Sequence, residues 1–320
     1  MGQYLIRRIV ISVPVLLFVT LIAFVLVNLA PGDPVTAMIN PATRAELGPD
    51  WVKERQAALG LDKPVIIRYG IWLKEVVQGN LGYSLVGGQS VSSQVAARIG
   101  PTLMLMGAAI VLGTMIGIPL GILSALRPNS WLDYGLTVLG FFAISTPTFF
   151  LGLAFMYIFA VHLKILPTSG MRTLGEPNSF TDLLKHMIMP VAVLALAHTP
   201  LVMRYARASM LESLRQDYVP TARAKGLKEH AVIIKHAFRN ALIPLITIVG
   251  LSLPELLSGA VITETIFQWP GMGLLAMRAV NARDYPLVLG VIIVTAAMVL
   301  ISNLIADLLY AIADPRIRYR

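Results

Sequence analysis

The chain has 320 residues, of which 56% are hydrophobic and 13% are charged. About a quarter of the residues of an ordinary soluble domain are charged, so this composition excludes a soluble globule. The net charge of +9 does not indicate nucleic-acid binding, because the basic residues flank apolar segments of membrane-spanning length and form no patch on a soluble face.

The first predicted element is a membrane span over residues 9–30. This run of 22 residues carries no charge and follows Arg7 and Arg8, and as a helix it is long enough to cross about 30 Å of hydrocarbon. A cleaved signal peptide would have a shorter apolar core and a cleavage site of small residues. The sequence therefore favours a retained span with its amino terminus in the cytoplasm.

Residues 31–100 form the longest polar segment and are predicted to be an extracytoplasmic cap. Residues 51–59 and 64–77 read as short amphipathic helices within it. In the second of these, the periodicity places four apolar side chains on one face: Ile66, Tyr69, Leu73 and Val76. The segment is too small to bury a large core and carries no catalytic constellation, which argues against a separate enzyme domain.

Five further apolar segments are predicted to span the membrane, over residues 102–126, 135–161, 187–203, 241–263 and 287–306. In the first of them, glycines recur every fourth residue, which indicates close packing against another helix: Gly113, Gly117 and Gly121. Pro147 is expected to kink the next span, and Pro190 and Pro200 are expected to break the one after it.

The distribution of charge predicts the topology. The loop over residues 204–240 has eight Lys or Arg residues and three acidic residues, and such a bias marks a cytoplasmic segment. The expected fold is an all-α polytopic membrane protein with six spans and both termini inside. We divide it into residues 1–30, the first span with its tail; residues 31–100, the cap; and residues 101–320, a five-helix core containing the loop.

Inside that loop, residues 217–226 have an ordered local pattern. Proline suits the start of a helix and keeps the preceding residue out of the α region, so we expect a six-residue helix from Pro220 to Lys225. Gly226 supplies a left-handed stop. So short a helix is not stable alone in water, and its small residues Ala222 and Ala224 suit close approach to a partner surface.

The wider pattern resembles the EAA loop of the transmembrane subunits of ATP-binding-cassette importers, in the form found in the peptide and nickel branch. The matching residues are Asp217, Tyr218, Thr221 to Leu227, His236, Ala237 and Arg239 to Pro244. Pro220 departs from the general consensus, which has Glu there. A plain basic loop that only orients the protein is the alternative interpretation, but orientation needs Lys and Arg without this ordered Pro, Ala and Gly pattern.

The resemblance implies a type I importer permease fold and a set of partners. These are a second homologous permease subunit, two cytoplasmic ATP-binding subunits, an extracytoplasmic substrate-binding protein and the lipid bilayer. It implies location in the plasma (inner) membrane of a bacterium or archaeon and transport of dipeptides or oligopeptides, with nickel complexes as an alternative. The residues implied to dock the ATPase subunits are Asp217, Tyr218, Pro220, Thr221, Ala222, Arg223, Ala224, Lys225 and Gly226.

No stretch of the chain fits the G-x-x-x-x-G-K-[ST] motif that binds nucleotide phosphates, so ATP hydrolysis is expected in another subunit. There is no H-E-x-x-H or G-x-S-x-G motif, no cysteine, and no histidine spacing typical of a metal site. We therefore expect no catalytic residue, no cofactor and no metal, and the chain is not predicted to be an enzyme.

A secondary carrier driven by an ion gradient is the second functional hypothesis. Such carriers need several ionisable groups near the middle of the membrane, and Glu255 is the one acidic residue predicted to lie inside a span. Glu255 and Pro147 are candidates for the translocation path. Glu255 equally suits an ion pair with a partner subunit or an outward-pointing position at the membrane surface.

Overall fold

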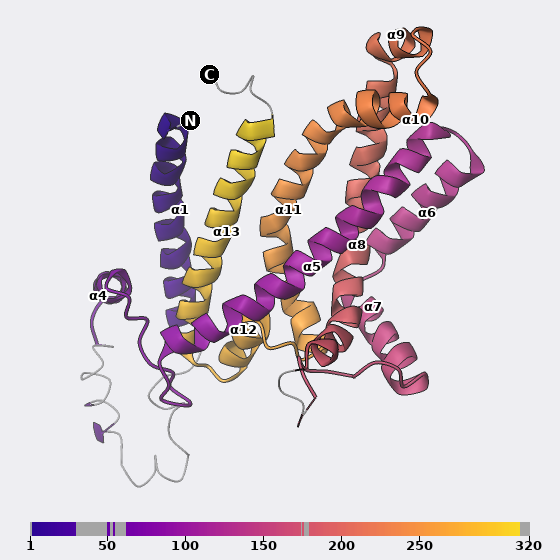
Figure 1. The fold of residues 1–320 in the computed structure, drawn as a ribbon. Helices are drawn as coiled ribbons and strands as arrows, with labels where there is room; N and C mark the ends of the chain where they lie inside the picture. Colours follow the sequence, from indigo (N-terminus) through magenta and orange to yellow (C-terminus); the bar gives the residue numbers. More distant parts are fainter. Residues whose placement is uncertain are drawn as a thin grey trace. The chain divides into compact units, whose positions relative to one another are not determined.

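The computed structural model describes residues 2–29, 50–51, 54, 62–173, 175 and 179–313. Within these ranges the chain is helical, apart from turns and a single antiparallel bridge between Tyr83 and Ser90. Figure 1 shows the helices, with these bounds: α1 Gly2–Leu29, α4 Val65–Val77, α5 Val91–Leu126, α6 Trp131–Ser145, α7 Thr148–Phe155, η1 Met156–His162, α8 Phe180–Leu214, α9 Tyr218–Ala224, α10 Glu229–Ala231, η2 Val232–Phe238, α11 Arg239–Ile266, α12 Met272–Asn281 and α13 Tyr285–Ala313.

Four of the described helices are each long and apolar enough to cross a membrane: α1, α5, α8 and α13. Two bent pairs pass the same test, so up to six spans are available if each pair counts as one. This range accommodates the six predicted spans. The predicted helix over residues 64–77 corresponds to α4, while nearly all of the one over residues 51–59 lies outside the described residues.

The predicted third span is sharply broken at the expected proline. Its two halves, α6 and α7 with η1, meet at an angle of 96°. Pro147 occupies the residue before α7 with ψ of 134°, and Thr146 before it is extended, as the ring of a following proline requires. The bend therefore follows from the local Thr-Pro sequence.

The prediction that Pro190 and Pro200 break the fourth span was wrong, because α8 runs through both. A proline removes one helical N–H, and a membrane helix tolerates this where other groups bond the freed carbonyls. The Thr199 hydroxyl beside Pro200 donates to the carbonyl of Ala195 at 2.7 Å, one residue before the carbonyl of Leu196 that Pro200 leaves free. The helix also continues past the predicted end of the span at residue 203 to Leu214.

The chain forms two compact units, and the first consists of Thr102–Pro270 with Val299–Arg320. Within this unit α5 packs against α8, and three glycines of α5 face α8. A Cβ at Gly113 would lie 2.9 Å from the His198 ring, and one at Gly121 would lie 2.5 Å from the Met203 carbonyl oxygen. The predicted packing role of these glycines is confirmed, because any side chain would push the two helices apart.

The second unit consists of Gly2–Pro101 with Gly271–Met298. Its core joins the start of α5 to α12 and α13 through buried residues that include Val91, Leu275 and Val288. Asp284, which is 1% exposed, accepts hydrogen bonds from the Ser84 hydroxyl and from the Leu85 amide at 3.1 Å. This buried carboxylate fastens the turn over residues 82–90 to the start of α13.

Candidate functional site: the α9 loop and its supports

The short loop helix exists, but it begins two residues earlier than predicted. It runs from Tyr218 to Ala224, so Pro220 is its third residue and Val219 is helical. Pro220 loses no hydrogen bond there, because the first four amides of a helix have no partner within it. The expected exclusion of Val219 from the α region was wrong. Its side chain is fully buried, and that packing outweighs the steric preference of a residue before proline.

The predicted stop at Gly226 is confirmed. Its φ is +73°, in the left-handed region that favours glycine, and its amide donates to the Arg223 carbonyl at 2.9 Å. Figure 1 shows α9 beyond the ends of α8 and α11, held on the connection between them.

The helix is held by its own chain. Val219 and Ala222 pack with Val232 of η2, and all three are buried. Arg223 forms an ion pair with Glu229, with its Nε 3.1 Å and its Nη2 2.5 Å from the two carboxylate oxygens. This hydrogen bonding raises the pKa of the Arg223 guanidinium and lowers the pKa of the Glu229 carboxyl, so both groups are charged at neutral pH. One apolar contact and one exposed ion pair therefore set the orientation of α9.

The exposed face of α9 differs from the predicted one at a single important position. Ala222 faces η2, with 5% of its surface exposed, and is not available to a partner. The other small residue, Ala224, is exposed. The remaining predicted docking residues are also exposed, except that Tyr218 is half-buried: Asp217, Pro220, Thr221, Arg223, Lys225 and Gly226.

After α9 the chain returns to the core of the first unit through η2. This segment is a π-helix, and its buried Ala237 packs in a cluster with Ala125 of α5, Met210 of α8 and Ala241 of α11. The small side chains allow the helices to approach closely. Through Ala237, η2 therefore packs against residues of α5, α8 and α11.

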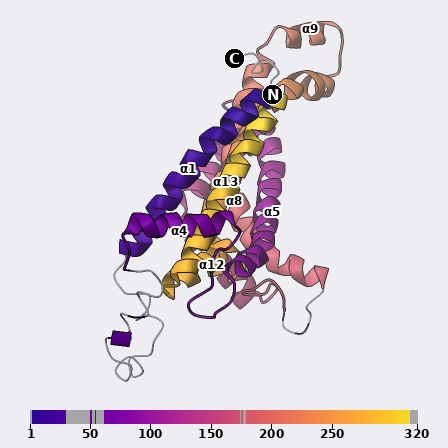
Figure 2. The same cartoon turned by 90° about the vertical axis from the view of Figure 1, so that its left-hand side faces the viewer.

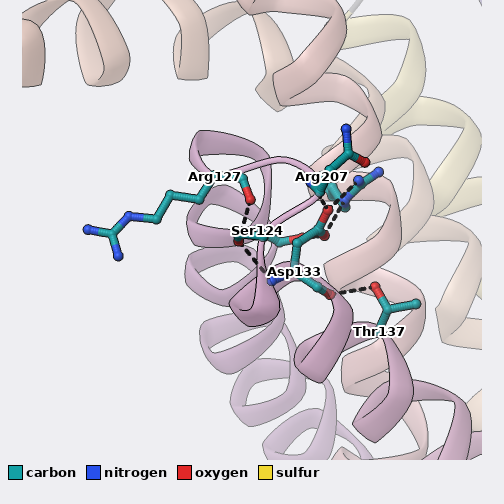
Figure 3. Close-up of polar contacts among 7 residues, drawn as sticks. Ser124, Arg127, Asp133, Thr137 and Arg207 are labelled. Atoms are coloured by element: carbon teal, nitrogen blue, oxygen red, sulfur yellow. Dashed lines mark hydrogen bonds and ion pairs between the residues drawn. The ribbon is translucent and has the colours of Figure 1, made fainter.

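A second link, which the sequence argument missed, joins α8 to the α5–α6 turn. Asp133 of α6 is 1% exposed and accepts two hydrogen bonds from Arg207 of α8, both of 2.7 Å (Figure 3). The same carboxylate accepts from the Ser124 hydroxyl of α5 and from the Asn129 amide at 2.9 Å. Four donors satisfy this buried charge, and they come from α5, the turn and α8.

The local sequence explains why Asp133 lies at this junction. Ser130 caps α6 by accepting from the Asp133 amide at 3.3 Å, which places the aspartate in the first helical turn. An acidic residue there also interacts favourably with the helix dipole. The Thr137 hydroxyl donates to the Asp133 carbonyl at 2.8 Å, one turn later (Figure 3).

The two candidates for the translocation path are not brought together by any described contact. Pro147 is exposed at the α6–α7 break. Glu255 belongs to α11, and its side chain lies outside the described residues. The structure instead buries Glu264 completely, with the Thr102 hydroxyl donating to its Oε1 at 2.7 Å. Because α11 continues to Ile266, Glu264 lies in the helix and not just beyond it, as the predicted span over residues 241–263 implied.

Within the described ranges, no group of three or more histidine, aspartate or glutamate side chains is arranged to hold a metal ion. The site instead combines an exposed short helix, α9, with its packed contact on η2 and the buried Asp133–Arg207 ion pair between neighbouring helices.

Comparison with known proteins identifies the family. Residues 117–319 match the family of binding-protein-dependent transport system inner membrane components, and residues 1–106 match the N-terminal membrane component of such systems. The chain belongs to this family. It is thus a multi-pass inner-membrane permease component of an ATP-binding-cassette importer, with the type I permease fold.

Two named relatives match this permease over the full length of both chains. The oligopeptide transport system permease protein AppB of Bacillus subtilis is 43% identical over 320 residues. The dipeptide transport system permease protein DppB of Escherichia coli K12 is 37% identical over 341 residues. A solved structure of the MetNI methionine ABC transporter in an inward-facing conformation has the same fold, with a TM-score of 0.51 and 16% identity over 67% of this chain and 95% of that one.

Membership implies ATPase and substrate-binding partners. As a permease component, the chain is not itself the ATPase of its transporter. The similarity to the oligopeptide and dipeptide permease proteins confirms the resemblance to the peptide branch. The roles of the individual loop residues stay predictions.

Proposed function

We propose that this permease imports dipeptides or oligopeptides, forming half of a translocation pathway with a second homologous subunit. Its observed full-length similarity to proteins named oligopeptide and dipeptide permeases carries the proposal. Two ATP-binding subunits on the cytoplasmic side and a substrate-binding protein outside complete the complex. Six spans with both termini inside are consistent with the described helices and with the basic loop over residues 204–240.

The α9 helix is the proposed docking site for an ATPase subunit. Closure of the ATPase pair on ATP would carry α9 with it, and the Val219–Val232 contact would pass the displacement to η2. From η2 the displacement reaches α5, α8 and α11 through the cluster around Ala237. The Asp133–Arg207 pair makes α6 follow α8. The result is a shift of population between two packings, biased by the nucleotide state of the partner.

The peptide function is tested by purifying the permease with its ATP-binding and second permease subunits and measuring ATP hydrolysis in vesicles. We expect hydrolysis to rise when the binding protein is loaded with a dipeptide or oligopeptide, and to remain at its basal rate with the empty binding protein. Stimulation by a nickel complex and not by peptides would overturn the substrate assignment. Uptake by the permease alone on an ion gradient would overturn the importer assignment in favour of a secondary carrier.

The docking site is tested separately by crosslinking. Because the chain has no cysteine, Ala224→Cys introduces a single thiol, on the exposed face of α9. We expect a crosslinker on this thiol to reach an ATP-hydrolysing subunit. Val86→Cys, exposed in the turn over residues 82–90, provides the control that stays uncrosslinked. Equal yields at both positions, or none at Ala224→Cys, would refute the docking assignment.

A further inference from the structure

The amphipathic helix α4 has two different apolar faces, and the fold of its unit accounts for one of them. Tyr69 is buried, and Tyr69 and Trp72 pack around Phe24 of α1, with ring centroids 5.6 Å from that of Phe24 in both cases. Leu73 joins the same cluster. The sequence argument placed Ile66 on this face, but Ile66 is 64% exposed and lies outside the contact.

The second face of α4 is apolar and uncovered within its unit. Its large side chains are Ile66, Ile67, Ile71 and Val77, which are exposed by 64%, 50%, 49% and 81%. At about 100° per residue they occupy one side of the helix, with Lys74 among them. A Lys ammonium on a long apolar stem can reach the water surface while its stem covers apolar surroundings.

The contacts with α1 fix the depth of α4. Asn28 of α1 accepts a hydrogen bond from Arg68, and Thr20 of α1 lies 3.0 Å from the Tyr69 hydroxyl. The centre of contact is Phe24, six residues before the end of the apolar run at residue 30, or about 9 Å along the helix axis at 1.5 Å per residue. Figure 1 views α4 nearly end-on, and Figure 2 shows it lengthwise across α1. The helix therefore crosses a spanning helix at a level inside its apolar run.

The hydrogen bonds of the Tyr69 hydroxyl independently support a position of α4 within the membrane, away from water. It donates to the carbonyl of Leu17 at 3.0 Å and also lies next to the Thr20 hydroxyl, which donates to the Leu16 carbonyl at 2.9 Å. A phenol at a wet surface can use water, whereas at membrane depth every polar group needs a partner in the protein. Both hydroxyls are satisfied by α1 itself.

From these observations we propose that α4 lies in the outer leaflet of the bilayer, with its isoleucine face against lipid acyl chains. The expected depth of such an interfacial helix is about 5–10 Å below the headgroup boundary, which matches its level on α1. Over the same stretch α1 also exposes large apolar side chains, with Ile22, Leu26 and Leu29 exposed by 43%, 61% and 74%, as expected of a helix in contact with lipid. A protein partner on the isoleucine face is disfavoured, because the cores of protein interfaces are enriched in aromatic residues and depleted in Lys. The aromatic residues of α4 instead point toward α1, and Lys74 lies on the isoleucine face.

The proposal changes the role of the segment after the first span. Part of the predicted extracytoplasmic cap becomes a membrane anchor, which fixes the outer end of α1 through lipid contact.

Depth-dependent quenching tests this directly in the assembled complex, reconstituted in phosphatidylcholine vesicles. Ile71→Cys is labelled with an environment-sensitive fluorophore and exposed either to lipids carrying a nitroxide on the upper acyl chain or to aqueous iodide. Phe18→Cys on the exposed face of α1 is the lipid control, and Val86→Cys is the aqueous control. All three replace exposed side chains, so folding is expected to be preserved.

We expect the label at residue 71 to lose most of its fluorescence to the nitroxide lipid, as at residue 18, and little to iodide. Quenching by iodide to the extent seen at residue 86 would overturn the proposal and place α4 in water. Quenching by neither reagent would also overturn it, because a second permease subunit or the binding protein would then cover this face.

Discussion

Removal of the Arg207 guanidinium is the sharpest test of the buried link between α8 and the α5–α6 turn. Breaking one side of a fully buried ion pair costs about 3–5 kcal/mol. The side chain of Asp133 is 2% exposed and that of Arg207 is 32% exposed, so water screens part of the pair. The Ser124 and Asn129 donors also remain on the carboxylate. We therefore expect Arg207→Gln to cost about 2–3 kcal/mol.

The assay is thermal unfolding of the purified permease in detergent, where this loss corresponds to about 3–5 °C in Tm for a chain of this length. Arg204→Gln is the matched control, because Arg204 is exposed about one turn earlier on the same helix. It removes the same charge and should change the free energy of unfolding by less than about 0.5 kcal/mol.

A double-mutant cycle separates the pair from its surroundings. The combination of Asp133→Asn with Arg207→Gln is expected to be less destabilising than the sum of the single changes, by about 1–3 kcal/mol. Each single change leaves one buried group without its counter-charge, whereas the double change removes both charges. Additive effects, or equal losses for Arg207→Gln and Arg204→Gln, would show that the two residues do not act as a pair. In vesicles, Arg207→Gln should lower uptake per ATP hydrolysed more than it lowers hydrolysis itself.

Four further changes test other features of the first unit. Gly121→Ala places a Cβ 2.5 Å from the α8 backbone and should cost about 1–3 kcal/mol by thermal unfolding, whereas Gly135→Ala, with nothing within 4 Å, should be neutral or stabilising. Val232→Ala opens the buried contact under α9, and limited proteolysis should then cut the loop faster while the long helices stay intact. Gly226→Pro is incompatible with φ of +73° and should leave the protein inserted but abolish peptide-stimulated ATP hydrolysis; stimulation at the normal rate would exclude a coupling role for the loop. Pro147→Ala should restore helical hydrogen bonding across the 96° break, and altered protection of that segment in hydrogen exchange would confirm the proline as its cause.

Local sequence signals predicted the features of this fold that depend on neighbouring residues. The Thr-Pro dipeptide before α7 and the glycine after α9 act through backbone sterics, which need no knowledge of the tertiary structure. The glycines of α5 also revealed their role, because a four-residue spacing places them on one helix face. The spacing alone did not predict that the partner helix is α8.

Tertiary contacts decided the features that were predicted wrongly or missed. Val219 is helical because it is buried against a residue in another segment, and Ala222 faces inward for the same reason. Asp133 and Arg207 are 74 residues apart, so the sequence argument did not connect them. One signal was available: a serine cap places Asp133 in the first turn of a helix whose preceding turn lies on the same side as the basic end of α8. That pattern offers a countercharge but cannot select one arginine among several.

The π-helical geometry of η2 has a consequence for engineering. A π-turn contains one residue more than an α-turn, so deleting a single residue from Val232–Phe238 would allow this segment to relax to the ordinary helical period. In an ordinary α-helix each residue removed rotates everything before it by about 100° around the helix axis, whereas removal of the surplus residue of a π segment keeps the register of the segments on both sides. We therefore expect a one-residue deletion within Val232–Phe238 to leave the outward-facing side of α9 unchanged, and a one-residue deletion in the α-helical part of α11 to turn it.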